Sequence, residues 1–491
     1  MTKNTLLDAL ISHQPDAAPF LDAPDGPTLS YGDLRAKVAT AAMHLQKAGV
    51  GPGDRVLCQI DKSQAGLILY LATVAAGGVF VPLNTAYTAA ELDYFLGDAE
   101  PALLILDDTT APARTVAKAR SVRVATPNEL TQPGPSATPV ARGSDDLAAI
   151  LYTSGTTGRS KGAMLTDDNL LTNAKALTEA WKWSSEDRLL HALPIFHTHG
   201  LFVATNVTLT AGASIVFLPA FSLDALALAL PECTTMMGVP TFYTRMLTDQ
   251  RFTREALAHM RLIISGSAPL LAETHEAFAD RTGHMILERY GMTETNMITS
   301  NPYEGTRRAG TVGMPLPGVE VRIEHTDDKG IGGISVKGPN VTPGYWRNDE
   351  KTAESFSADG WFITGDLGVI DDDGYLSIVG REKDLIISGG YNIYPKEIEV
   401  EIDALPGVVE SAVYGVPHPD MGEAVAAAVV PAGPDVTDDE TILAALADRL
   451  ARFKIPRSVV FLPELPRNTM GKVQKSQLRE TWRQTIPGST S

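Results

Sequence analysis

Residues 152–161 read Tyr-Thr-Ser-Gly-Thr-Thr-Gly-Arg-Ser-Lys, and this stretch decides the fold. It follows the apolar run 147–151, which predicts a buried strand. Two glycines let the backbone approach a bulky anion, because no Cβ stands in the way. The side-chain donors are Thr153, Ser154, Thr156, Thr157 and Lys161. Together with the backbone amides they suit a polyphosphate.

The loop differs from the P-loop motif. That motif has four residues between its glycines and a Ser or Thr after its lysine. Here two residues separate Gly155 from Gly158, and Gly162 follows Lys161. An ordinary Gly/Ser/Thr turn after a strand is the alternative. The density of donors, and the motifs farther along the chain, argue against that alternative.

Length and composition narrow the function classes. A chain of 491 residues exceeds one simple core, so two or more domains are expected. A formal charge of −18 argues against a nucleic-acid partner, because phosphate backbones would be repelled. Cys58 and Cys233 form no motif and are expected to be reduced thiols in the cytoplasm. Gly and Pro interrupt the apolar run 67–83, and the start shows no signal-peptide pattern, so no membrane partner is expected.

Apolar runs and amphipathic segments alternate along the N-terminal part of the chain. Strands are expected at 79–82 and 102–106, and helices at 67–76 and 169–183. This alternation predicts an α/β fold with mostly parallel strands. The Pro-, Ala- and Thr-rich stretch 111–144 is expected to be a surface connection.

A domain boundary is expected within 378–390, Ile-Val-Gly-Arg-Glu-Lys-Asp-Leu-Ile-Ile-Ser-Gly-Gly. We assign residues 1–382 to a large N-terminal domain of α/β sheets with mixed β structure. Residues 383–491 alternate strand and helix patterns, beginning with a helix that has Pro395 in its first turn. They are expected to form a small, mobile α+β lid.

Two features permit more than one interpretation. Histidines at 191, 197 and 199 suggest a metal site, but they lack a helical His-x-x-x-His spacing and a nearby Cys or acidic residue. A zinc site is therefore not expected. Arg245 follows an apolar strand and could extend its guanidinium to the surface. Alternatively, it reaches into a binding site.

Four further motifs follow in order. Residues 261–270, Arg-Leu-Ile-Ile-Ser-Gly-Ser-Ala-Pro-Leu, end in small side chains against which a flat ring can lie. Residues 287–295, Leu-Glu-Arg-Tyr-Gly-Met-Thr-Glu-Thr, supply a carboxylate of the kind that magnesium prefers. Residues 360–366 end in Thr-Gly-Asp, and residues 465–473 carry a Gly-Lys pair. Taken alone, the last two are common turn and surface features.

In this combination and order, the motifs resemble those of the adenylate-forming enzymes, which are acyl-CoA synthetases, luciferases and peptide-synthetase adenylation domains. The likeness covers nearly the whole chain and is nearest to bacterial malonyl-CoA synthetases. It implies an AMP-forming acid–thiol ligase that uses ATP, Mg²⁺ and coenzyme A.

The resemblance also implies roles for individual residues. Lys472 would be delivered by the lid during adenylation, Glu294 would bind magnesium, Thr293 would bind the α-phosphate, and His197 would lie near the reacting carboxylate. Asp366 would hold the ribose. The residues expected to contact ATP are Thr153, Ser154, Gly155, Thr156, Thr157, Gly158, Lys161, Ser267, Ala268, Pro269, Glu288, Arg289, Tyr290, Gly291, Met292, Asp366, Arg381 and Lys472.

The lid is expected to move between two half-reactions. Lys383 matches the hinge of the family, and its rotation would withdraw Lys472 after adenylation. Ser388, Gly389 and Gly390 would then line a channel for coenzyme A. The resemblance further suggests an acetyltransferase and a deacetylase acting on Lys472 as protein partners.

Charge selects the acid. A buried arginine without a partner lowers the stability of the fold. An arginine in the acyl site therefore indicates an anionic substrate. Arg289 and Arg245 are expected to clamp a second carboxylate, as guanidinium groups favour. This predicts malonate, with methylmalonate tolerated if the pocket wall at Thr198 and Met297 allows. The acyl-site candidates are thus Arg245, Arg289, His197, Thr198 and Met297.

Three other functions fit part of the pattern. A synthetase for short monocarboxylates would not need the two arginines. An adenylation domain that loads a carrier protein would be followed by a carrier domain. A nucleotide-sensing protein would not need Lys472, Glu294 and Asp366. We expect instead an ATP-dependent ligase that joins malonate to coenzyme A through an acyl-adenylate, with AMP and diphosphate as products.

Overall fold

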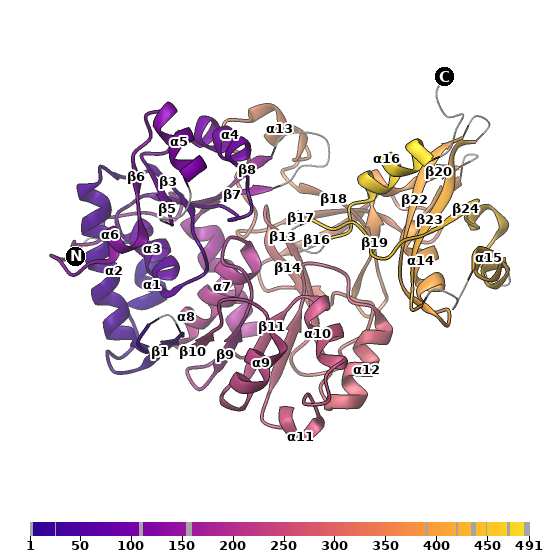
Figure 1. Ribbon diagram of the computed structural model, residues 1–491, viewed down its shortest axis with the longest axis horizontal. Coiled ribbons are helices and arrows are strands. Elements are labelled where there is room, and N and C mark those ends of the chain that lie inside the picture. The colour runs from indigo at the N-terminus through magenta and orange to yellow at the C-terminus, as the bar shows by residue number, and fades with distance from the viewer. Residues whose placement is uncertain are drawn as a thin grey trace. The chain divides into compact units, whose positions relative to one another are not determined.

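A computed structural model gives the fold of the chain (Figure 1). It describes residues 3–24, 26–107, 111–153, 160–388, 391–418, 421–433, 438–447, 449–468 and 472–485. The chain divides into two compact units. The first comprises residues 1–270, 274–321 and 336–362, and the second comprises 271–273, 322–335 and 363–491. The α/β class and the division into a large and a small part are confirmed, whereas a boundary between 382 and 383 remains a prediction.

Six of the described strands form a sheet in the first unit, in the order β6-β5-β3-β4-β7-β8. The strands run parallel up to β7, and β8 is antiparallel to β7. Apolar residues of the strands pack against the helix α4, which makes one hydrophobic core. The bounds are β3 (Arg55–Gln59), β4 (Val79–Pro82), β5 (Leu103–Leu106), β6 (Val124–Ala125), β7 (Leu147–Thr153), β8 (Lys161–Thr166), α2 (Tyr31–Lys47), α3 (Gln64–Ala75), α4 (Ala89–Ala99), α5 (Ala111–Ala119) and α6 (Pro127–Thr131).

A second sheet of the first unit contains nine of the described strands, in the order β15-β14-β13-β12-β11-β9-β10-β1-β2. It is parallel from β1 to β13 and antiparallel at both edges. The strands are β1 (Pro19–Asp22), β2 (Leu29–Ser30), β9 (Arg188–His191), β10 (Ser214–Phe217), β11 (Thr235–Gly238), β12 (Leu262–Ser265), β13 (Leu287–Met292), β14 (Asn296–Ser300) and β15 (Met314–Pro315). The helices of this region are α1 (Thr5–Ile11), α7 (Asp167–Ala180), the π-helix η1 (His199–Asn206), α8 (Val207–Ala211), α9 (Leu223–Ala229), the 3₁₀ turn η2 (Leu230–Glu232), α10 (Pro240–Leu247), α11 (Arg254–Leu257) and α12 (Ala272–Thr282).

The sequence expectations for individual elements are confirmed with one exception. The strand expected at 79–82 is β4, and the helix expected at 169–183 is α7. The stretch 111–144 was expected to be a surface connection, and this is wrong in part, because it contains α5, β6 and α6. Thr126 caps the start of α6 with a capping box. The Thr126 hydroxyl accepts a hydrogen bond from the Glu129 amide, and the Glu129 carboxylate accepts one from the Thr126 amide.

A sheet of β16 (Glu320–Glu324), β17 (Gly332–Lys337), β18 (Phe362–Ile370) and β19 (Leu376–Arg381) has residues in both units, and α13 (Asp349–Glu354) belongs to the first. The second unit also contains a sheet in the order β21-β20-β23-β22, with β24 beside β23. Alternate residues of β22 and β23 enter two different cores, one with α14 and α15 and one with α16. The bounds are β20 (Ile386–Ser388), β21 (Tyr391–Ile393), β22 (Val408–His418), β23 (Gly422–Pro431), β24 (Ser458–Phe461), α14 (Pro395–Asp403), α15 (Asp439–Ala447), α16 (Lys475–Thr485), and the 3₁₀ turns η3 (Glu382–Asp384) and η4 (Arg452–Lys454).

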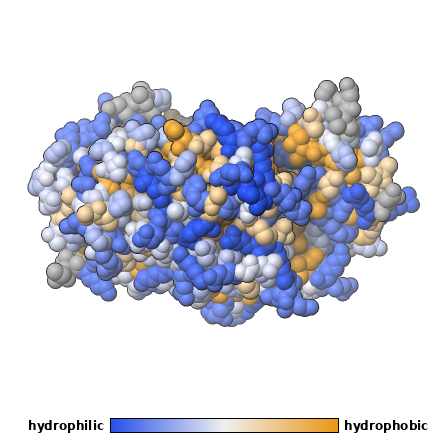
Figure 2. Space-filling view, turned by 90° about the horizontal axis from the view of Figure 1, so that it is seen from below, coloured by the Kyte–Doolittle hydropathy of each residue, from blue (hydrophilic) through white to orange (hydrophobic). Residues whose placement is uncertain are grey.

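The face of the molecule in Figure 2 is mainly hydrophilic, with apolar residues gathered in separate patches. In the described part of the chain, no helix combines the length and the apolar character that a membrane span requires.

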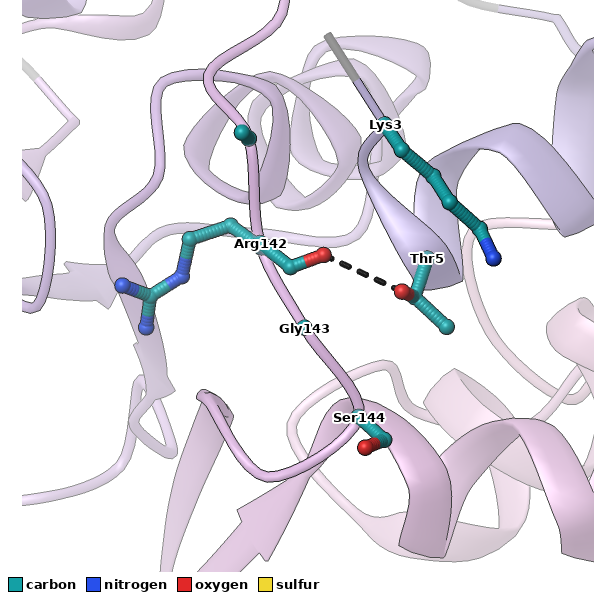
Figure 3. Close-up of a pocket in the computed structure, with 6 residues that line it drawn as sticks. Lys3, Thr5, Arg142, Gly143 and Ser144 are labelled. Atoms are coloured by element: carbon teal, nitrogen blue, oxygen red, sulfur yellow. Dashed lines mark hydrogen bonds between the residues drawn. The ribbon is translucent and has the colours of Figure 1, made fainter.

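Polar contacts hold the N-terminal helix α1 against the rest of the first unit. The Thr5 hydroxyl donates to the Arg142 carbonyl oxygen at 3.0 Å, while the Arg142 guanidinium points away from Lys3 and Thr5 (Figure 3). The Leu6 amide donates to Asp167 Oδ2 at 3.2 Å. Burial raises the pKa of Asp167 to about 7, because a charged carboxylate is poorly solvated there. Asp167 therefore makes the stability of this unit depend on pH.

Asp167→Asn is expected to flatten the pH dependence of stability. An Asp in an unfolded chain has a pKa of about 3.9. Because the folded-state pKa is higher, the stabilisation is complete below about pH 4 and is lost as the pH rises through about 7. One group changes the free energy of unfolding by at most about 1.4 kcal/mol per pH unit. Thermal unfolding of the native protein and of Asp167→Asn, measured between about pH 4 and about pH 7, tests this prediction. Asp168→Asn is the control. Identical pH profiles for all three proteins would contradict the prediction.

Candidate active site

A hairpin fixes both ends of the 152–161 loop. β7 and β8 pair antiparallel, with Thr153 opposite Lys161 and Tyr152 opposite Gly162. The predicted phosphate ligands Ser154, Gly155, Thr156, Thr157 and Gly158 lie outside the described residues. Burial, followed by the nearby Lys351 ammonium, lowers the pKa of Lys161. Lys161 thus stands at the end of the loop in a partly desolvated position, near charged groups of both signs.

The helix α4 supports this hairpin from one side. The Tyr94 hydroxyl donates to the Ser160 carbonyl oxygen at 2.6 Å, and the Tyr152 hydroxyl donates to Asp98 Oδ2 at 2.5 Å. The Phe95 ring packs against Tyr152, with 4.6 Å between ring centroids. Residues on both sides of the loop are therefore held by the same helix.

The turn between β13 and β14 presents Thr293 and Glu294. Met292 pairs with Asn296 across the hairpin, and Asn296 adopts φ +48°. Glu294 is 6 % exposed, and its Oε1 accepts the Tyr345 hydroxyl at 3.0 Å. Lys161 Nζ lies 5.8 Å from the centroid of the Tyr345 ring. The structure therefore brings Lys161 and Glu294, which belong to two separate motifs, to one tyrosine.

Arg289, on β13, is a buried cation. It is 4 % exposed, and its Nε and Nη2 have no hydrogen-bond partner among the described residues. The guanidinium lies against the backbone of Gly266, where any Cβ would overlap it. Burial lowers the pKa of Arg289 to about 9, so it stays protonated at neutral pH. A protonated guanidinium in this position calls for an anion.

Polar atoms of His199 and of segments next to it and to Gly266 are also buried. His199 Nδ1 is 3.1 Å from Ser267 Oγ, and Ser267 has a strained φ of +73°. Burial, followed by the charge of Arg289, lowers the pKa of His199, so its imidazole is neutral. Within the described part of the chain, the buried atoms His199 Nε2, Thr198 Oγ1 and Ser265 Oγ have no hydrogen-bond partner.

The remaining acyl-site candidates occupy different environments. Met297 is 2 % exposed and pairs with Gly291 across the hairpin, and His197 Nδ1 accepts the His199 amide at 3.3 Å. Arg245, on α10, is exposed, and its guanidinium lies 5.8 Å from the centroid of the Phe221 ring. Burial thus distinguishes the two arginines of the predicted clamp.

Glu288, an ATP-site candidate on β13, forms a buried pair with His275 of α12. His275 Nδ1 lies 3.3 Å from Glu288 Oε1, and both side chains are buried. Burial raises the pKa of Glu288, and the neighbouring His275 opposes this effect. Ser267, Ala268 and Pro269 follow β12, and Tyr290, Gly291 and Met292 end β13, so the two motifs lie at the ends of adjacent strands.

Asp366 and Arg381 meet in the second unit. They are opposite each other on β18 and β19, and Arg381 Nε is 3.0 Å from Asp366 Oδ1. Asp366 is 4 % exposed. Lys383 follows in the turn η3, where burial and then Arg381 lower its pKa. The residues predicted for the ribose and the hinge are thus close to one another.

Lys472 is paired with Asn468 in the second unit. Its amide donates to Asn468 Oδ1 at 3.0 Å, and the Asn468 amide donates to the Lys472 carbonyl oxygen at 2.9 Å. The Lys472 residue is exposed. Ser388, predicted for the coenzyme A channel, is buried at the end of β20, and Gly389 and Gly390 lie outside the described residues.

Sequence reasoning missed four residues of this arrangement. Ser265 and His199 were passed over although they belong to quoted segments, and their burial was not readable from sequence. His275 has no motif around it. Tyr345 follows a Pro-Gly turn, which gives a signal for local structure only.

Comparisons with known proteins cover most of the chain. Residues 7–346 match the family model described as AMP-binding enzyme, and residues 397–472 match the AMP-binding enzyme C-terminal domain. The ATP-bound MatB structure from Rhodopseudomonas palustris is 51 % identical with a TM-score of 0.95, over 98 % of this chain and 99 % of that one.

Two curated relatives differ in the acid that they are named for. Feruloyl-CoA synthase from Amycolatopsis sp. is 38 % identical over 92 % of this chain and 94 % of the relative. Malonate–CoA ligase from Arabidopsis thaliana is 37 % identical over 84 % of this chain and 75 % of the relative.

Tyr94→Phe is expected to weaken ATP binding by roughly five- to tenfold, because one hydrogen bond to the loop, worth about 1 kcal/mol, is lost. Calorimetric titration with a non-hydrolysable ATP analogue measures the change. Tyr87→Phe, on the chain just before α4, is the control. Equal affinities for the native protein and Tyr94→Phe would show that α4 does not set the loop.

Proposed function

The chain belongs to the AMP-binding enzyme family and is an ATP-dependent, AMP-forming acyl-CoA ligase, and from this premise we propose that its acid substrate is malonate. In the first half-reaction a malonate carboxylate oxygen attacks the α-phosphorus of ATP, and the bond to diphosphate breaks. In the second, the thiol of coenzyme A attacks the acyl carbon, AMP leaves, and the thiol proton goes to solvent. The products are malonyl-CoA, AMP and diphosphate.

The buried Arg289 guanidinium is the observation that carries the choice of malonate. The feruloyl group has no second carboxylate, so it would leave this protonated guanidinium buried without a counter-charge, which costs several kcal/mol. The far carboxylate of malonate would accept from Nε and Nη2, the two atoms without a partner among the described residues. The same argument disfavours a short monocarboxylate.

Three further buried polar atoms without a partner among the described residues support the same assignment. The neutral His199 can donate from one ring nitrogen, and Ser265 and Thr198 each offer a hydroxyl. Met297 supplies an apolar wall, and this wall would decide whether the extra methyl group of methylmalonate fits. Arg245 is exposed, so we assign it the second place in the clamp, at the entrance of the acyl site.

Glu294 fits a role as magnesium ligand. It is a buried carboxylate held by a hydroxyl and located near the cationic end of the phosphate loop. Among the described residues no group of three His, Cys, Asp or Glu side chains could hold a metal ion, so phosphate oxygens and water would supply the other ligands. A bound Mg²⁺ would neutralise phosphate charge during adenylation.

The other residues take the roles that the resemblance implies. Thr293 and the loop at 152–161 hold phosphates, and Asp366 with Arg381 holds the ribose. His197 borders the reacting carboxylate. Lys472 neutralises charge at the reacting oxygens in the adenylating arrangement, and rotation about Lys383 then opens the channel for coenzyme A. Acetylation of Lys472 remains a prediction.

Arg289→Ala is expected to reduce kcat/KM for malonate by about 100-fold or more, because a charge-assisted contact worth about 3 kcal/mol is lost. Rates with malonate, acetate and octanoate, followed by diphosphate release, measure it. Acetate should be unaffected, or improved.

Arg289→Lys is the matched variant, since it keeps the charge and loses the fork of donors; it should recover only part of the malonate rate. Arg245→Ala should have a smaller effect than Arg289→Ala. Malonate activity that survives Arg289→Ala in full would refute the assignment of the acid.

Lys472→Ala is expected to lower malonate-dependent ATP–diphosphate exchange by about 100-fold or more, as for removal of one stabilising donor. Conversion of pre-formed malonyl-adenylate and coenzyme A should persist. Lys475→Ala, on the same segment, is the control. Loss of both half-reactions would argue against a role confined to adenylation.

A further inference from the structure

We infer that Tyr345 is a positioning residue for adenylation, which orients the Glu294 carboxylate for magnesium and places Lys161 beside it. The inference rests on the proposed metal role of Glu294 and adds to it a residue outside the motifs. Tyr345 contacts both groups through different parts of one side chain, the hydroxyl and the ring face.

The backbone of Tyr345 is fixed to the strand that leaves the phosphate loop. The segment 344–346 lies beside β8: the Met164 amide donates to the Gly344 carbonyl oxygen at 3.0 Å, and the Trp346 amide donates to the Gly162 carbonyl oxygen at 2.8 Å. The Tyr345 amide donates to Thr352 Oγ1 at 2.9 Å. The backbone that carries the ring is therefore fixed to the strand that begins at Lys161.

The hydroxyl is well placed to hold Glu294. Tyr345 is 6 % exposed, and its hydroxyl donates to Glu294 Oε1 at 3.0 Å. A tyrosine hydroxyl is protonated at neutral pH, so it is the donor to this carboxylate. A hydrogen bond to the charged form favours the ionised carboxylate. The Thr342 amide also donates to the Glu294 carbonyl oxygen at 2.7 Å, which fixes the turn itself.

The ring accounts for the position of Lys161. An ammonium within about 6 Å of an aromatic centroid is attracted to the ring face. The Lys161 ammonium is at 5.8 Å from the Tyr345 centroid. A single side chain thus sets the distance between the cation that would meet phosphate and the carboxylate that would hold the metal.

Residues that orient a metal ligand change metal affinity by roughly 10–100-fold when altered. Tyr345→Phe keeps the ring over Lys161 and removes only the hydroxyl. Calorimetric titration of Mg²⁺ into the complex with a non-hydrolysable ATP analogue should therefore show a dissociation constant raised by about 10-fold or more. The KM for malonate should not change, because the acyl site is untouched.

Controls separate this role from general packing. Tyr31→Phe removes another buried tyrosine hydroxyl, which donates to the Ala213 carbonyl oxygen at 2.8 Å, and should leave Mg²⁺ affinity unchanged. Glu294→Gln should weaken Mg²⁺ binding, and adding Tyr345→Phe to it should cost nothing further.

Each outcome decides one point. If Glu294→Gln weakens Mg²⁺ binding and Tyr345→Phe does not, the positioning role of Tyr345 is wrong and the metal role of Glu294 stands. If Glu294→Gln has no effect, the metal role and the inference fail together. Neither result bears on the choice of malonate, which the panel of acids tests separately.

Discussion

The site depends on one constraint, a protonated guanidinium that the described residues leave buried without a counter-charge. Arg289 cannot be solvated at 4 % exposure, and the described residues give Nε and Nη2 no acceptor. Such a charge is tolerated only if the surrounding fold is rigid and a ligand completes it. The backbone of Gly266 supplies the rigid side, because a glycine there lets the guanidinium lie flat against the strand end. The buried charge of Arg289 therefore lowers the stability of the unliganded fold, while it favours an anionic ligand.

The topology explains why the groups converge. β9, β11, β12 and β13 are adjacent and parallel, so their carboxyl ends share one edge of the sheet. Ligands of α/β proteins bind at this edge. His191 ends β9, Ser265 ends β12, and Arg289 lies in the middle of β13, one residue past the last pair with β12. The antiparallel turn after β13 then carries Glu294 toward β8, where segment 342–346 joins the two sheets.

Local patterns predicted most of the fold, and motifs predicted the chemistry, but neither predicted the contacts between motifs. β4 matches its expected bounds because four buried residues, which follow two glycines and end in a proline, are legible as a strand. The composition of 111–144 concealed three short elements, although Thr-Pro-Asn-Glu at 126–129 carried a readable helix start. Tyr345 is 51 residues from Glu294, and no periodicity spans that separation. For Arg245 the sequence allowed a side chain at the surface or one that reaches into a binding site, and the structure shows the side chain exposed.

The π-helix η1 has a consequence for how this enzyme can diverge. A π-helix holds one residue more per turn than the regular helix, and such segments recur at functional sites. His199 begins η1 and touches Ser267. Deleting one residue would restore regular winding and change which side chains of the segment lie beside Ser267. New substrate preferences in this lineage should therefore arise by exchange of residues along η1, while its length is retained.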